Sequence, residues 1–155
     1  MNQKLAWSLK SFDELTNTEL YELLRLRNEV FVLEQKCIFL DQDNKDQKCY
    51  HLMGKDGEHL MAYSRIVPPG LSYQYPSIGR VVVSSLGRGK TYGVELMQNS
   101  IRAIQKYYGM EPIRIGAQLY LRKFYESFGF QQSSAVYDED GIDHIEMTKL
   151  SSIGE

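Results

Sequence analysis

The sequence has no long hydrophobic stretch and is poor in cysteine, proline and tryptophan. Its 155 residues include 2 cysteines, 4 prolines and 1 tryptophan. The longest apolar runs, such as Val30–Leu33, are far shorter than the ~20 residues that a membrane-spanning helix requires. Asn2 to Lys4 do not lead into the apolar segment of a secretory signal peptide. We therefore expect a cytoplasmic protein that has no membrane partner.

The sequence also lacks a strong excess of charge of either sign. Lysine and arginine number 18 against 20 aspartates and glutamates, a formal net charge of −2. Without a global positive field the protein has no general attraction for nucleic acid or anionic lipid, so any anion site must be local. Cys37 and Cys49 are isolated, and their spacing to His51 and His59 matches no zinc pattern. We expect reduced, partly buried thiols and no metal site.

The hydrophobic periodicity predicts a mixed order of strands and helices in one domain over residues 1–155, an α/β (α+β) fold class. The expected strands are Leu5–Leu9, Tyr50–Gly54, Leu60–Ile66, Ile78–Val83, Pro112–Ala117 and a segment from Val136 to about Leu150. Asp56-Gly57 is a hairpin turn signal that joins the second of these strands to the third. The first expected helix follows the Thr16–Glu19 capping-box pattern, the second begins near Thr91, and the third covers Leu119–Phe128 and is closed by Gly129. In the second helix, the stripe of Val94, Met97, Ile101 and Ile104 predicts a face that packs on the sheet.

Arg27 falls where the apolar stripe of the first helix would continue, so its charge is expected to turn inward and to need a partner. We favour an ion pair with Glu34 or with an aspartate of the next loop, and the alternative is substrate binding. That loop carries Asp41, Asp43 and Asp46, which resemble part of a calcium loop. Asp46 stands where calcium loops require glycine, so a polar turn with surface aspartates is expected instead.

The strongest local signal is the glycine-containing loop Ser84–Lys90, between a predicted strand and a predicted helix. The first amides of a helix lack intrahelical partners and the helix dipole favours anions there. Arg88 and Lys90 add local positive charge. Gly89-Lys90-Thr91 resembles the end of a Walker loop, but that pattern requires glycine at the position of Ser84. A phosphate-binding loop outside the nucleoside-triphosphate enzymes is therefore expected.

The loop Arg88-Gly89-Lys90-Thr91-Tyr92-Gly93, read with the later segment Phe124–Phe130, resembles the GNAT superfamily of acyl-CoA N-acyltransferases. Three further segments, Leu26–Gln35, Gly79–Val83 and Glu139–Met147, resemble its ElaA-type branch, and the similarity runs from about Trp7 to Met147. The resemblance implies a mostly antiparallel sheet, flanked by helices and splayed open between its fourth and fifth strands. Acyl-CoA would lie in that gap.

The resemblance also implies a set of residues that bind acetyl-CoA, with the pyrophosphate on the loop amides and the pantetheine arm on the fourth strand. These residues are Val81, Val82, Val83, Arg88, Gly89, Lys90, Thr91, Tyr92, Gly93, Gln118 and Tyr125. Thr91 stands where relatives usually carry glycine, and Gln118 where many carry asparagine.

For catalysis, the resemblance gives Tyr125 the place of a general acid for the departing thiolate. A backbone amide of the fourth strand, at Val83 or its neighbour, would polarise the thioester oxygen. The general base is left open among Glu34, His51, His144 and Glu139, with Glu34 favoured. Arg27, Phe31, Glu34, Arg80 and His144 are the candidate substrate-binding residues.

These features predict an acetyl-CoA-dependent N-acetyltransferase that passes the acetyl group directly to a primary amine of unknown identity. The acidic tract from Asp138 to Glu146 is either a solvated turn or a surface that attracts a cationic amine. Two alternatives stay open: a non-catalytic domain that binds or senses acyl-CoA, and an enzyme similar to the acyl-homoserine-lactone synthases. The sequence does not indicate the oligomeric state.

Overall fold

The structure is a computed structural model, and it describes residues 4–151. The strands are β1 (Ala6–Ser11), β2 (Tyr50–Asp56), β3 (His59–Val67), β4 (Ser77–Val83), β5 (Ile113–Gln118), β6 (Phe130–Gln132), β7 (Tyr137–Glu139) and β8 (Ile142–Lys149). The α-helices are α1 (Asn17–Arg27), α2 (Tyr92–Tyr108) and α3 (Arg122–Glu126). The shorter helical segments are η1 (Phe12–Glu14), η2 (Asn28–Glu34), η3 (Asp46–Lys48), η4 (Ser85–Gly87) and η5 (Leu119–Leu121).

The first sheet has the strand order β1-β2-β3-β4, and every neighbouring pair is antiparallel. The predicted hairpin joins β2 to β3: Asp56 pairs with His59, and Gly57 has a φ of +60° in the two-residue turn. A positive φ at a hairpin turn is a conformation that glycine adopts without steric cost. The Asp-Gly signal in the sequence therefore fixed this turn correctly.

The second sheet has the order β5-β8-β6, and β7 pairs with β8 beside them, again antiparallel throughout. Strand β6 was not among the expected elements. It spans three residues, of which Gln131 and Gln132 are polar and exposed. Such a short segment has too little alternation to signal a strand, and its pairing with β8 creates it.

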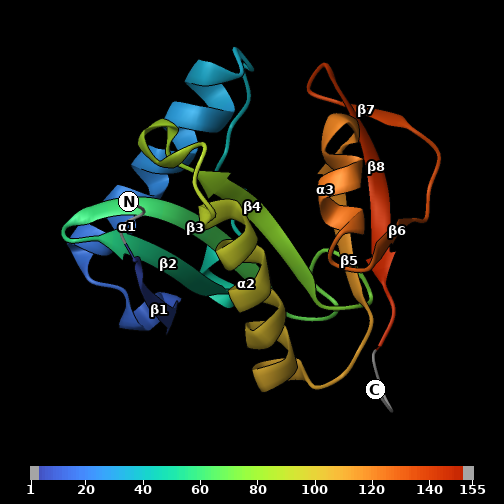
Figure 1. Cartoon of the computed structure of the whole chain (residues 1–155), viewed down its shortest axis with the longest axis horizontal. Helices are drawn as coiled ribbons and strands as arrows, with labels where there is room; N and C mark the ends of the chain where they lie inside the picture. Colours follow the sequence, from blue (N-terminus) through green and yellow to red (C-terminus); the bar gives the residue numbers. More distant parts are fainter. Residues whose placement is uncertain (1–3, 152–155) are drawn as a thin grey trace.

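The two sheets meet at β4 and β5 and separate along their length. Arg114 N donates a hydrogen bond of 3.1 Å to the carbonyl of Pro76, near the starts of both strands. Beyond it the strands belong to different sheets, and Figure 1 shows them diverging toward their C-terminal ends. The expected opening between the fourth and fifth strands is confirmed.

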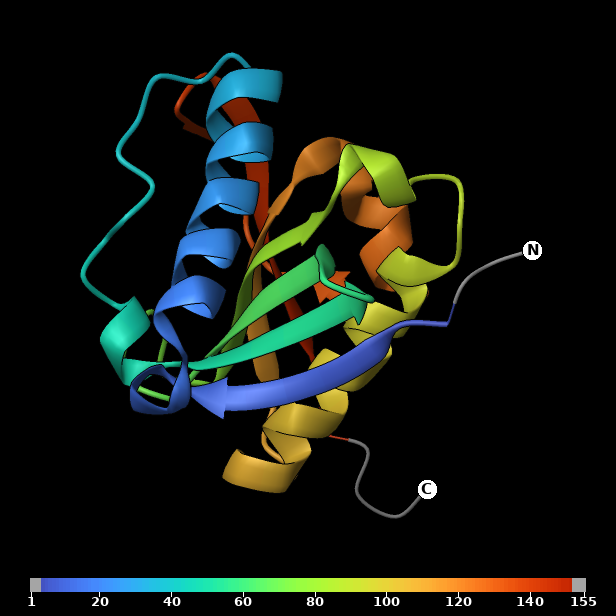
Figure 2. The same cartoon turned by 90° about the vertical axis from the view of Figure 1, so that its left-hand side faces the viewer.

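Helices α1 and α2 cover opposite faces of the first sheet (Figure 2). From α1 and η2, Leu23, Leu26 and Val30 pack with Met53 and Tyr63 of the sheet. The Thr16 cap is confirmed: its side chain accepts from Glu19 N, and the Glu19 carboxylate accepts from Thr16 N.

On the other face, the buried side of α2 is formed by Tyr92, Leu96, Met97, Ser100, Ala103 and Ile104. Val94, which the predicted stripe included, is 43% exposed. The buried face is thus rotated relative to the prediction, because Leu96 and Tyr92, rather than Val94, fill the space above Leu52 and Met61.

The expected helix over Leu119–Phe128 is shorter, consisting of the 3₁₀ turn η5 followed by α3. It is closed at Gly129, as predicted, where φ is +95°. Among residues 4–151, none of the helices has the length and apolar character needed to cross a membrane.

Candidate active site

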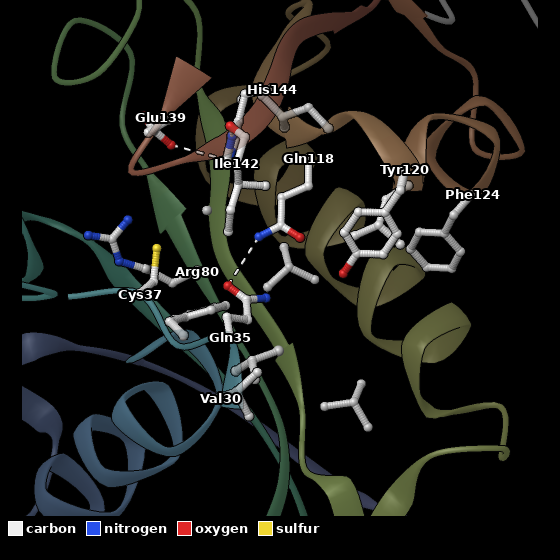
Figure 3. Close-up of a pocket in the computed structure, with 18 of the residues that line it drawn as sticks. Val30, Gln35, Cys37, Arg80, Gln118, Tyr120, Phe124, Glu139, Ile142 and His144 are labelled. Carbon is white, nitrogen blue, oxygen red and sulfur yellow. Dashed lines mark hydrogen bonds and ion pairs between the residues drawn. The ribbon is translucent and has the colours of Figure 1, made fainter. Parts of the chain in front are cut away.

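A cavity of about 490 Å³ lies in the opening between β4 and β5. Its walls come from both sheets, from η2 and the turn after it, from the start of α2, from α3 and from the β7–β8 hairpin. Figure 3 shows polar side chains from several of these segments converging on it. The cavity therefore lies where the facing edges of β4 and β5 are not paired with each other.

Most of the site residues expected from the sequence line this cavity. They are Phe31, Glu34, Arg80, Val81, Val82, Val83, Arg88, Gly93, Gln118, Tyr125 and His144. Gly89, Lys90, Thr91 and Tyr92 complete the loop at its edge without lining it. Gln35, Cys37, Tyr120 and Phe124 also line it and were not expected.

The glycine loop needs glycine at two of its positions for different reasons. Gly89 has a φ of +79°, a conformation that side chains strain. At Gly87 a Cβ would lie 2.8 Å from the Tyr92 ring, so the close packing of loop on helix excludes a side chain. Thr91 has an ordinary φ of −86° and its hydroxyl donates to Glu95. The departure from glycine at Thr91 therefore leaves the loop conformation undisturbed.

Strand β4 carries a bulge that opens its edge toward the cavity. Tyr63 pairs with Val82 and Arg65 with Gly79, so Arg80 and Val81 together face one residue of β3. Arg80 has a φ of +49°, and such bulges leave the extra residue out of the ladder. Further along, Ser84 N donates to the carbonyl of Met61 on β3. Because strand amides alternate in direction, the Val83 amide points to the opposite edge, toward the cavity.

Comparison with known proteins identifies the family. A family model described as an acetyltransferase (GNAT) domain matches residues 30–151. The chain belongs to the GNAT acetyltransferase family. Protein ElaA of Escherichia coli is 38% identical over 147 residues, covering 94% of this chain and 96% of that protein. Its crystal structure superimposes with a TM-score of 0.88 at 37% identity, over 94% of this chain and 99% of that one.

Two further solved structures are similar to this chain in fold. A crystal structure of an acyl-CoA N-acyltransferase from Pseudomonas aeruginosa has a TM-score of 0.90 and 39% identity, over 94% of this chain and 99% of that one. A GNAT acetyltransferase from Elizabethkingia anophelis with acetyl-CoA bound has a TM-score of 0.65 and 12% identity, over 96% and 99% of the two chains. At that identity only the fold is shared. The family and its ElaA-type branch, both expected from the sequence, are confirmed.

In this GNAT chain Arg88 of the glycine loop forms an ion pair with Glu34, the residue favoured as general base. The Arg88 guanidinium meets the Glu34 carboxylate at 2.8 Å and 2.6 Å through two different nitrogens. Both side chains are nearly half exposed, at 45% and 42%. The pair joins η2 to the glycine loop and neutralises both charges. A base role for Glu34 stays a prediction, and this ion pair disfavours it because both carboxylate oxygens already contact Arg88.

Two other contacts join the segment after η2 to the second sheet. The Gln118 amide donates to the Gln35 side-chain oxygen at 3.3 Å, across the middle of the cavity (Figure 3). The Cys37 thiol donates to the carbonyl of Asp140 at 2.9 Å. Sequence reasoning missed Gln35 and Cys37 because their spacing carries no motif, and only the closure of the two sheets brings them to the site.

Three arginines and three aspartates form a closed ring of ion pairs beneath one wall of the cavity. Going round, each of the six contacts two of the others, at 2.8 to 3.5 Å: Arg27, Asp41, Arg80, Asp43, Arg65 and Asp46. Burial alone would raise the pKa of Asp43 and Asp46, but the hydrogen bonds and charges of the arginines outweigh it and hold both pKa values below the usual range. The ring is electrically balanced.

The ring corrects two expectations about single residues. Arg27 is completely buried and contacts Asp41 and Asp46 rather than the cavity. Its side chain thus forms the ion pair with loop aspartates, and substrate binding by Arg27 is excluded in this conformation because no atom is accessible. The aspartates were expected on the surface, but Asp41 and Asp46 are 5% and 6% exposed. The ion pair of Arg27 with this loop was one of the expected pairings, but the other partners, Arg80 and Arg65, are distant in sequence and gave no local signal.

Tyr125 lines the cavity from α3 and is 6% exposed. Its ring packs edge-on against Phe124 and Phe130, and its hydroxyl makes no hydrogen bond to another described residue. Burial raises the pKa of Tyr125 well above its ordinary value, so the phenol is protonated at neutral pH. A phenol with an unshared proton is suited to donate it to an anion that forms beside it.

The two buried histidines differ in their surroundings. His51 is fully buried in the first sheet, between the Tyr63 hydroxyl at 2.7 Å and the Asp46 carbonyl at 2.9 Å. It is an interior histidine with both nitrogens used. His144 lies at the cavity, next to Glu139 of the β7–β8 hairpin. Within residues 4–151, no three His, Cys, Asp or Glu side chains are grouped to hold a metal ion.

Proposed function

We propose that the protein is an acetyl-CoA-dependent N-acetyltransferase, which transfers the acetyl group directly to a primary amine in a ternary complex. One observation carries the proposal: the opening between β4 and β5 has the glycine loop at one end of its wall. A slot between parted strands admits a long, thin arm, and a helix N-terminus beside it accepts a phosphate group. Membership of the GNAT family supports the same donor.

The residues present fit coenzyme A. The positive φ at Gly89 and the exposed start of α2 allow phosphate oxygens to approach the backbone closely. Lys90 and Arg88 supply charge once Arg88 leaves Glu34 for a phosphate. The backbone groups of Val81 to Val83 lie on the free edge of β4. The amides of the pantetheine arm can pair with them in the way that an added strand pairs with a sheet edge.

When bound, acetyl-CoA supplies a thioester carbonyl and a thiolate leaving group. The Val83 amide, aimed at the cavity, is proposed to hydrogen-bond the carbonyl oxygen as negative charge builds there. Tyr125 is proposed to give its proton to the departing sulfur. No side chain of the chain forms a covalent intermediate in this scheme, since the amine and the thioester react while both are held in the cavity.

The experiment is a titration calorimetry measurement with acetyl-CoA, followed by a free-thiol assay over a panel of amines. Micromolar binding with thiol release that depends on an amine supports the proposal. Binding without thiol release for any amine would favour a sensing domain instead. Thiol release that requires acyl-carrier protein and S-adenosylmethionine would favour an enzyme of the acyl-homoserine-lactone synthase type. Absence of acetyl-CoA binding would overturn the proposal.

A further inference from the structure

The β7–β8 hairpin sets two titratable side chains at one end of the cavity. Its turn consists of Asp140 and Gly141, with φ of +53° and +83°, the pattern of a two-residue type I′ turn. Ile142 therefore pairs with Glu139, and His144 pairs with Tyr137 on one side and with Gln118 of β5 on the other. The hairpin fixes His144 in the strand between β5 and β7, where it lines the cavity.

The hydrogen bonds of His144 determine which nitrogen carries its proton. Nδ1 lies 2.8 Å from the carbonyl oxygen of Ile142. A carbonyl oxygen only accepts, so Nδ1 donates and the Nε2 lone pair of the neutral ring is free. Nε2 faces a carboxylate oxygen of Glu139 at 3.3 Å. With the ring neutral, both atoms are acceptors and neither can donate to the other.

A ligand that donates hydrogen bonds to both Nε2 of His144 and the Glu139 carboxylate would fit between them. An alkylammonium carries three N–H groups on one atom, so it can donate to Nε2 of His144 and to the Glu139 carboxylate at the same time. The side chain of His144 is 9% exposed and that of Glu139 is 58% exposed. The imidazole is therefore shielded within the site, while the carboxylate reaches solvent.

The charges around the cavity favour the same ligand. Its two arginines are already paired, Arg88 with Glu34 and Arg80 with Asp41 and Asp43. Glu139 and Asp140 line the cavity, and neither carboxyl group has an arginine or lysine partner among the described contacts. This end of the cavity attracts cations, and within residues 4–151 no free cationic side chain lines it to receive a carboxylate or phosphate on the acceptor.

We infer that His144 and Glu139 form the acceptor site, binding an alkylammonium and removing its proton. The inference rests on the proposed function and deepens it. His144 is the catalytic base, since it contacts the reacting nitrogen, and Glu139 is a positioning residue that holds the cation and then faces the imidazolium. The favoured acceptors are alkylamines without a carboxylate beside the nitrogen.

The protons balance as follows. An alkylammonium is protonated at neutral pH because the pKa of such amines is about 10.4. One N–H bond breaks, the proton moves to Nε2 of His144, and the electron pair stays on nitrogen to attack the thioester carbonyl. The C–S bond then breaks and sulfur takes the phenolic proton of Tyr125. The nitrogen loses its second proton, which restores the phenol, and His144 releases the first to solvent beside Glu139.

The test compares His144→Gln and Glu139→Gln with wild type in the thiol assay. We expect His144→Gln to lower kcat about 100-fold while the Kd for acetyl-CoA changes less than twofold. Glu139→Gln raises the KM for the amine about tenfold, the loss that a charge-assisted contact implies, with a smaller fall in kcat, and Glu139→Asp restores part of it. His59→Gln, at the exposed β2–β3 turn, is the matched control and keeps wild-type kinetics.

The amine panel identifies the class of acceptor. 1,3-Diaminopropane and Nα-acetyl-lysine amide present the same alkylammonium from a small molecule and from a peptide side chain, and their kcat/KM values distinguish these two sources. Glycine, which has a carboxylate next to its nitrogen, is expected to be a poor acceptor. Unchanged kcat in His144→Gln, or a preference for glycine, would overturn the inference and leave the proposed function standing.

A binding measurement separates the two proposals if no amine is acetylated. In nuclear magnetic resonance spectra, propylammonium is expected to shift the ring signals of His144, whereas tetramethylammonium, which has charge but no N–H, is not. That result supports the ammonium site even if the transferase assay fails. Equal responses to both cations, or none to either, would overturn it.

Discussion

The Arg80 guanidinium contacts both the side chain and the backbone of Asp41. Nε of Arg80 lies 2.8 Å from Oδ1 of Asp41, and Nη2 donates to the Asp41 carbonyl at 2.7 Å. Arg80 is also the residue with a φ of +49° in the bulge of β4, a strained conformation for a side chain of this size. The loop after η2 thus stabilises the bulge, and through it the shape of the cavity wall.

Removing one arginine from the buried ring is expected to destabilise the protein strongly. Arg27→Met leaves Asp41 and Asp46 without their shared partner, and breaking a buried ion pair costs about 3–5 kcal/mol. The free energy of unfolding in urea measures the loss. Arg25→Met, on the same helix, removes only an exposed pair with Glu29 and is expected to cost about 0.5 kcal/mol or less. Equal losses in the two variants would contradict the buried-ring interpretation.

The glycine loop can be tested by adding a side chain at a positive φ. Gly89→Val is expected to weaken acetyl-CoA binding about tenfold or more, because the branched side chain forces the loop away from its left-handed conformation. Gly57→Val imposes the same kind of backbone strain at the β2–β3 turn, outside the cavity. Calorimetry with both variants measures the effect. The prediction fails if the two lower the affinity alike, or if neither does.

Tyr125→Phe removes the phenolic proton and retains the ring that packs against Phe124 and Phe130. We expect kcat to fall about 100-fold, the lower end of the range for general acid catalysis, while the Kd for acetyl-CoA stays nearly constant. Tyr21→Phe, a phenol that is 72% exposed on α1, serves as the control. Thiol release at the wild-type rate by Tyr125→Phe would remove this residue from the acid role.

Stability is expected to fall as the pH drops below about 6.5, the ordinary value for histidine. Burial lowers the pKa of His51 in the folded protein, so the unfolded chain binds a proton that the folded protein resists. Stability from His51 is therefore complete above the unfolded pKa and is lost as the pH falls toward the folded one. Urea unfolding between pH 5 and 8 measures this slope.

The histidine variants separate this source from others. His51→Gln is expected to flatten the slope between pH 5 and 7, whereas His59→Gln leaves it unchanged. Below about pH 4 a second loss is expected in every variant, because the pKa values of Asp43 and Asp46 are depressed by their arginines. An unaltered slope in His51→Gln would show that another group controls stability in this range.

The local signals in the sequence were accurate where one segment decides its own conformation. Thr16 and Glu19 cap α1, Gly57 turns the first hairpin, and the start of α2 follows the loop at Thr91. Each of these depends on backbone geometry or on hydrogen bonds between residues that are neighbours along the chain. The same signals did not give β6 or the rotation of α2 that exposes Val94, since both depend on what packs against them.

By itself the sequence determined the order of the strands up to β5 and of the three α-helices, the glycine loop and the inward turn of Arg27. The tertiary structure alone decided the partners: Asp41 and Asp46 for Arg27, Arg88 for Glu34, and Glu139 for His144. The physical reason is that a side chain's own propensities act over a few residues, whereas its distant contacts are set by which surfaces the sheets bring together. The acceptor end of the cavity exists only because two sheets part at β4 and β5.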